Sequence, residues 1–176
     1  HNGHGAVGFQ AVDRYGLLQS LFPSATQHFS EQVLNKKNGL IPGALRNTDQ
    51  RLADRKPVIS PFLCSVLLWR QVQQASRMKS GGNRSIFENL HSSADGVLQE
   101  LHPTVRIPRR ISAVMIEIWE LQIRLEQRRP RTIKRLLSHR RFRAAYDFLL
   151  LRAGAGEVSD SLADWWTEIQ EMPPTD

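Results

Sequence analysis

Cysteine, long apolar runs and metal-ligand patterns are all scarce in this sequence of 176 residues. The single cysteine, Cys64, excludes an internal disulfide and is typical of a reducing compartment. Cys64 lies in the apolar run PFLCSVLLW, which predicts a small buried side chain. No apolar run approaches the roughly 18–20 residues that a membrane-spanning helix needs. The start, HNGHGAVGFQ, lacks the basic and apolar regions of a signal peptide, and we expect a cytoplasmic protein.

Catalytic motifs are also missing. No two of the six histidines are spaced i, i+4 or lie beside a cysteine pair, which argues against a zinc site. The sequence has no Gly-x-Ser-x-Gly elbow, no GxxxxGK[ST] loop and no Asp-x-Asp pair. Asp160 and Asp164 are helically spaced and are interpreted as charges near a helix N-terminus. We therefore expect no catalytic residue, metal ligand or cofactor in this chain.

Apolar residues recur with the helical period along nearly the whole chain, and no segment alternates as a strand would. The predicted fold class is all-α, an irregular array of about seven to nine helices without a significant sheet. Ser60 is the expected N-cap of one helix, with Pro61 at its first position. The polar, glycine-rich segment 74–87 is expected to be a surface loop. The predicted helices cover residues 8–22, 39–55, 60–72, 85–101, 109–128, 131–139, 141–152 and 159–172.

A polar segment, ALRNTDQRLADR (44–55), interrupts this pattern and allows two interpretations. Asn47, Thr48 and Asp49 are poor helix-interior residues and good caps, so the segment could be a helix junction capped by Thr48 or Asp49. It could instead form a polar network that fixes one helix against another. The local composition slightly favours the junction.

Charge is unevenly distributed along the chain. The formal net charge is +7 and the isoelectric point about 10.3, which suggests an anionic partner. Residues 103–152 carry 13 basic and 4 acidic groups, whereas residues 153–176 carry 6 acidic groups and no basic one. The basicity therefore belongs mainly to one stretch, which is followed by an acidic one.

Arginine dominates the basic stretch, and its guanidinium group matches phosphate oxygens bidentately. A solvated charged face is the plainer interpretation. Against it, Glu126 and Asp147 are the only acidic residues between positions 124 and 147, and Arg143 can reach only the second of them, at i+4. Arg140 and Arg141 have no such local partner, so we expect a phosphate clamp at the start of the helix 141–152. The residues predicted to bind a nucleic-acid backbone are Arg109, Arg110, Arg124, Arg128, Arg129, Arg131, Lys134, Arg135, Arg140, Arg141 and Arg143.

Several segments together resemble one family. They are GHGAVGFQAVDRYGLLQSLFP, ALRNTDQRLADRKPVISPFLCSVLLW, IPRRISAVMIEIWELQIRL, HRRFRAAYDFLLLRA and DWWTEIQ, in this order along nearly the whole chain. Taken together they resemble the C-terminal half of bacterial poly(A) polymerase, a class II nucleotidyltransferase related to the CCA-adding enzymes. The CCA-adding enzymes typically lack the arginine-rich ending, which favours the poly(A) polymerase family.

The resemblance implies an enzyme that adds AMP from ATP to RNA 3′ ends without a template. In that family an N-terminal head carries a Gly-Ser…Asp-x-Asp motif that holds two Mg²⁺ ions, and a neck carries a Glu-Asp…Arg motif that reads the base. Neither motif occurs here, so the resemblance implies a chain that is inactive alone and that works with a head outside it. Residues 1–102 would form the end of the neck and the RNA-binding body. Residues 103–176 would form an arginine-rich helical region ending in an acidic helix that contains tryptophan.

Two alternatives stay open. The chain could be a non-enzymatic basic helical module that docks an acidic protein, with Trp165 and Trp166 either supporting that contact or packing in the core. It could also be the C-terminal part of a CCA-adding tRNA nucleotidyltransferase, which would prefer folded tRNA to linear RNA.

Overall fold

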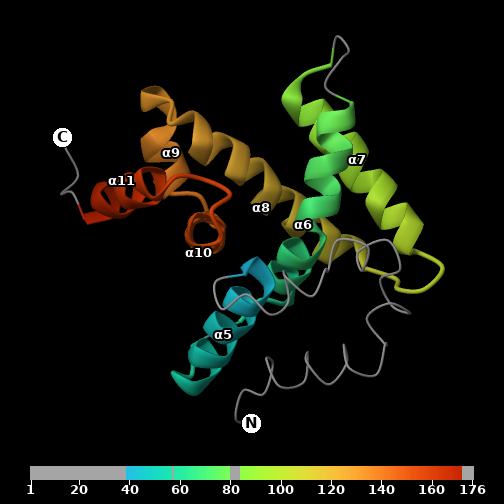
Figure 1. The fold of residues 1–176 in the computed structure, drawn as a ribbon, viewed down its shortest axis with the longest axis horizontal. Helices are drawn as coiled ribbons and strands as arrows, with labels where there is room; N and C mark the ends of the chain where they lie inside the picture. Colours follow the sequence, from blue (N-terminus) through green and yellow to red (C-terminus); the bar gives the residue numbers. More distant parts are fainter. Residues whose placement is uncertain (1–38, 57, 80–83, 172–176) are drawn as a thin grey trace.

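A computed structural model of the chain describes residues 39–56, 58–79 and 84–171 (Figure 1). Within these ranges the fold is all-α, as predicted, with seven α-helices, one 3₁₀ turn and no strand. The helix predicted over residues 8–22 lies outside the described residues. The elements are α5 (Leu40–Ala53), α6 (Ser60–Met78), α7 (Ile86–Leu101), α8 (Arg109–Gln127), η1 (Pro130–Thr132), α9 (Ile133–Leu137), α10 (Phe142–Gly154) and α11 (Asp160–Glu171).

Local signals explain where several of these helices begin. α7 starts with a capping box, in which the Ser85 hydroxyl accepts the Glu88 N–H at 3.2 Å and the Glu88 carboxylate accepts the Ser85 N–H at 2.6 Å. α8 begins directly after Pro108, as expected. The predicted cap of α6 is wrong by one residue, because Ile59 is the N-cap and Ser60 is already helical.

α6 is longer than the sequence suggested. The segment 74–87 was expected to be a loop, yet the helix continues to Met78. The physical reason is that residues 74–78 contain no glycine or proline and several good helix formers, so nothing stops the helix before the glycines at 81 and 82. The loop prediction is therefore wrong for residues 74–78, and residues 80–83 lie outside the described part of the chain.

α5 runs unbroken through the polar segment 44–55, so the favoured helix junction is wrong. Thr48 is only 7% exposed and does not cap a helix end. The helix ends instead in a Schellman motif, in which the Lys56 N–H donates to the Arg51 carbonyl at 2.8 Å and the Arg55 N–H to the Leu52 carbonyl at 3.1 Å. Arg55 takes the left-handed conformation with φ 57° that this motif requires.

A close approach joins α5 to α10. Gly43 is buried on α5, and a Cβ at this position would lie 2.8 Å from the Leu151 Cδ2 atom of α10. The two helices pack against each other directly, which brings the polar side of α5 beside the start of α10. This contact forms the pocket described below.

The buried side chains form two clusters that share α8 and α10. The first core cluster joins α5, α6, α7 and the first half of α8, and it includes Phe148 of α10. The second core cluster joins the second half of α8 to α9, α10 and α11. In Figure 1, α8 runs between the two groups of helices. The buried indoles of Trp119 and Trp166 each donate to a backbone carbonyl across a helix interface, at 3.0 Å in both cases.

Arg152 of α10 lies where the two clusters meet. Its side chain is 2% exposed, and its guanidinium carbon lies 4.7 Å from the ring centroid of Trp69. It donates to Glu126 at 2.7 Å and to the buried amide oxygen of Gln122 at 3.2 Å. A third, longer contact reaches Glu157 at 3.4 Å. A buried cation is tolerated only with such partners, so Arg152 has a structural role.

Candidate nucleic-acid interface

The eleven predicted basic residues do not form one patch. Arg109 and Arg110 begin α8, whereas Arg128 follows its last residue. A helix of 19 residues is about 28 Å long, so these two groups lie at opposite ends of α8 (Figure 1). Arg124 lies in the last turn of α8, and the remaining residues belong to the turn after α8, to α9 and to the start of α10.

The exposed basic residues from the end of α8 through η1 into α9 form what we call the α8–α9 corner, residues 128–135. Arg129, Arg131 and Arg135 are exposed and make no ion pair with any residue that the structure describes. Arg128 ends α8 in the left-handed conformation, with φ 44°, and its guanidinium carbon lies 5.7 Å from a Trp165 ring centroid. The corner therefore contains three arginines, Arg129, Arg131 and Arg135, whose positive charge no described carboxylate offsets.

The start of α10 is different, because a distant carboxylate neutralises part of it. Glu117 of α8 accepts a hydrogen bond from Arg140, and another from Arg141 at 3.2 Å. The expectation that acidic partners are scarce here is wrong, since Glu117 is 23 and 24 residues away in sequence. Burial raises the pKa of Glu117, but the hydrogen bonds and charges of the two arginines outweigh it and hold this pKa below its usual value.

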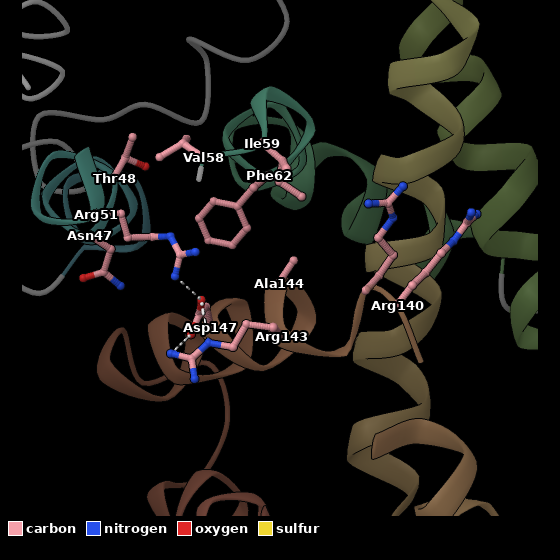
Figure 2. A pocket seen from close by; sticks show the side chains of 11 residues that line it. Asn47, Thr48, Arg51, Val58, Ile59, Phe62, Arg140, Arg143, Ala144 and Asp147 are labelled. Carbon is pink, nitrogen blue, oxygen red and sulfur yellow. Dashed lines mark hydrogen bonds and ion pairs between the residues drawn. The ribbon is translucent and has the colours of Figure 1, made fainter. Parts of the chain in front are cut away.

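Asp147 is the second carboxylate of this region. Its predicted pair with Arg143 at i+4 is present at 3.0 Å, and Arg51 of α5 lies 3.9 Å from the same carboxylate. Figure 2 shows the three side chains converging between α5 and α10. The polar segment of α5 thus contributes to an interhelical network, which was the alternative interpretation of residues 44–55.

A pocket of about 190 Å³ opens beside this network. Its apolar part comes from the end of the α5–α6 connection, the first turn of α6 and α10 (Figure 2). Its polar part comes from the middle of α5 and from three of the predicted basic residues. The lining residues are Asn47, Thr48, Arg51, Val58, Ile59, Phe62, Arg140, Arg141, Arg143, Ala144 and Asp147. Sequence reasoning singled out the polar segment of α5 and the three arginines separately, but it did not place them together and did not identify the apolar lining.

The other predicted residues vary in their contacts. Arg124 lies 3.8 Å from the Glu120 carboxylate and over the ring of Phe87 at 4.8 Å from its centroid, which holds it against the surface. Arg109 and Arg110 are exposed and have no ion pair among the described residues. Lys134, in contrast, has a non-covalent contact and is not a free cation.

The described residues offer little else for chemistry. They contain no group of three or more histidine, cysteine, aspartate or glutamate side chains that could hold a metal ion. Burial raises the pKa of the Cys64 thiol, which disfavours the reactive thiolate. In the same ranges no helix is long and apolar enough to cross a membrane.

Fold and site together define an all-α, arginine-rich region with a basic corner and an arginine-rimmed pocket. Comparison with known proteins identifies its family. Residues 82–176 match the family model described as "Polymerase A arginine-rich C-terminus", and the chain belongs to this family.

Whole-chain relatives agree with this assignment. The chain is 30% identical over 175 residues to Poly(A) polymerase I of Salmonella typhi, and these residues cover 98% of this chain. It is 30% identical over 177 residues to Poly(A) polymerase I of Escherichia coli O6:H1, and 31% over 170 residues to that of Haemophilus influenzae, covering 99% and 96% of this chain. The chain spans about 38% of the length of each of these relatives.

Proposed function

We propose that this chain is the RNA-holding C-terminal part of a bacterial, cytoplasmic poly(A) polymerase, which adds AMP from ATP to RNA 3′ ends without a template. ATP and Mg²⁺ would be bound by a catalytic head outside these 176 residues, and the chain alone would be inactive. Membership of the arginine-rich family supports this proposal. The observation that carries the RNA-holding role is the α8–α9 corner, where Arg129, Arg131 and Arg135 lack described ion-pair partners.

Electrostatics explain why such a corner suits RNA. Exposed guanidinium groups without carboxylate partners keep their full charge for phosphate oxygens, whereas the arginines at the start of α10 must share theirs with Glu117 and Asp147. Binding to the phosphate backbone releases counterions, so affinity should fall steeply with salt and depend little on sequence. The corner is therefore expected to contribute more to affinity than the clamp predicted at the start of α10.

The test measures binding of a fluorescently labelled single-stranded RNA by anisotropy, between about 50 and 200 mM salt. In the variant R129Q/R131Q we expect weaker binding and a salt slope smaller by about 1.4, since each lost phosphate contact removes about 0.7 for single strands. The matched control R77Q/R106Q loses the same charge at exposed residues outside the predicted set. Equal weakening in both variants would mean that net charge alone acts, and absence of RNA binding by the unmodified chain would overturn the proposal.

A further inference from the structure

We propose that the pocket between α5, α6 and α10 binds one unpaired nucleobase of RNA, while Arg140 and Arg143 hold the adjacent phosphates. The inference rests on the proposed function, because it assigns a specific subsite to the RNA that the region would hold. It differs from backbone binding in that the base itself, and not only the phosphate chain, would contribute to affinity.

The size of the pocket suits a single base. Its volume of about 190 Å³ lies below the roughly 300–1,000 Å³ of sites that enclose drug-sized ligands, so it admits one flat ring system and not a whole nucleotide. Val58, Ile59, Phe62 and Ala144 supply apolar walls. Figure 2 shows the Phe62 ring between α5 and α10, and this ring forms a T-shaped pair with Phe148, with the centroids 6.3 Å apart. An aromatic face in an open pocket stacks on any base, because every base has a π-face.

Polar groups at the pocket wall match the edge of a base. The side-chain amide of Asn47 both donates and accepts, and Asp147 presents a carboxylate that Arg51 and Arg143 hold in place at 3.9 Å and 3.0 Å. Exocyclic amines and ring nitrogens need this combination of donors and acceptors. The wall is therefore equipped to orient a base that enters from solvent.

The rim of the pocket can exchange its ion pairs for phosphate. The side chains of Arg140 and Arg143 are 69% and 67% exposed, whereas those of their partners Glu117 and Asp147 are 30% and 18% exposed, so the guanidinium side of each pair is open to water. Exposed pairs of this kind contribute little to stability, and each guanidinium group has donors beyond those its carboxylate uses. Phosphates on either side of a bound base could therefore be held without disrupting the fold.

The apolar walls favour RNA over an acidic protein as the occupant. Aspartate and glutamate side chains would contact the arginines at the rim but would leave the surface around Phe62 uncovered. A nucleotide unit combines a flat apolar ring with a neighbouring anion, which is the same combination that the pocket offers.

The test compares oligoadenylate with an abasic ribose–phosphate oligomer of the same length and charge, by fluorescence anisotropy on the full chain. We expect the unmodified chain to bind oligoadenylate more tightly. The substitution Ala144→Leu fills the pocket, and we expect it to weaken oligoadenylate binding at least about fivefold and leave abasic binding unchanged. Ala113→Leu, at an exposed position of α8, is the matched control.

A second variant keeps the proposal testable if A144L fails to fold. Phe62→Leu removes the stacking ring but keeps an apolar side chain, and we expect it also to reduce the preference for oligoadenylate. The pocket inference is overturned if A144L and F62L both keep the full preference, or if the unmodified chain binds the abasic oligomer equally tightly. It is likewise overturned if an acidic peptide displaces bound oligoadenylate as effectively as the abasic oligomer displaces it. Each of these outcomes overturns the pocket inference but leaves the proposed RNA-holding function intact. The proposed function itself fails only if neither oligomer binds.

Discussion

Glu117 offsets part of the positive charge at the start of α10. Its carboxylate accepts from both Arg140 and Arg141, and its side chain is 30% exposed. These two arginines were predicted to bind phosphate because no acidic residue lies near them in sequence. Their pairing with Glu117 makes this carboxylate a competitor of any phosphate that they bind.

Replacing Glu117 with Gln should therefore strengthen RNA binding. The substitution releases two guanidinium groups and removes one negative charge, and an exposed pair of this kind corresponds to about 0.4–1 kcal/mol. We expect a roughly two- to fivefold tighter complex with single-stranded RNA, measured by anisotropy at low salt. Glu100→Gln, at an exposed position of α7, makes the same charge change away from these arginines. If E100Q and E117Q strengthen binding equally, Arg140 and Arg141 do not contact the RNA.

The same variant should alter the response of stability to acid. The pKa of Glu117 lies below its ordinary value of 4.5 in the folded protein, so its ion pairs stabilise the fold above that pH. The stabilisation is lost as the pH falls through the lowered pKa, because the protonated carboxyl no longer pairs with the arginines. E117Q should consequently lose less stability than the unmodified chain when denaturant unfolding is compared at neutral pH and below pH 4.5.

At the scale of the elements, sequence reasoning predicted most of the helices. Six of the seven described helices begin and end within two residues of their predicted first and last residues, because apolar periodicity and proline positions are local signals. α6 was predicted too short, since its last turn is polar and follows the apolar stripe without a stop signal. The break expected within α5 was wrong because tertiary packing buries Thr48 and overrides its local preference for a cap.

The end of α5 supplies a prediction about stability. Arg55 occupies the left-handed position of the Schellman motif, where residues with a Cβ are strained by about 1–2 kcal/mol and glycine is not. The gain from Arg55→Gly is reduced by the larger conformational freedom of glycine in the unfolded chain, about 0.4–1 kcal/mol. We expect R55G to raise the free energy of unfolding by about 0.5–1 kcal/mol, measured by urea denaturation.

A control separates backbone strain from the loss of charge at this position. Arg55→Ala removes the same charge but keeps the Cβ, so it should give no comparable gain. If R55A stabilises the protein as much as R55G does, the left-handed conformation is not the cause.

At the scale of the whole molecule, sequence reasoning located the charge but not its partners. The basic stretch 103–152 and the acidic stretch after it are visible from composition alone. Ion pairs decide which arginines keep an unpaired charge, and several of these pairs connect residues far apart in sequence. Examples are Arg140 with Glu117 and Arg51 with Asp147. The pocket was unpredictable for the same reason, because it forms only when Gly43 allows α5 to pack against α10.

The two core clusters should unfold as one unit, because α8 and α10 contribute to both and Arg152 joins them. Arg152→Met keeps an apolar stem over Trp69 but leaves Glu157 and Gln122 without this donor, which should cost about 3 kcal/mol of stability. Hydrogen exchange should then show protection in α6 and in α11 falling by the same factor. The exposed Arg131→Met serves as the control and should leave both helices protected. Loss of protection in α11 alone would show that the second core cluster opens independently and that Arg152 does not couple the two.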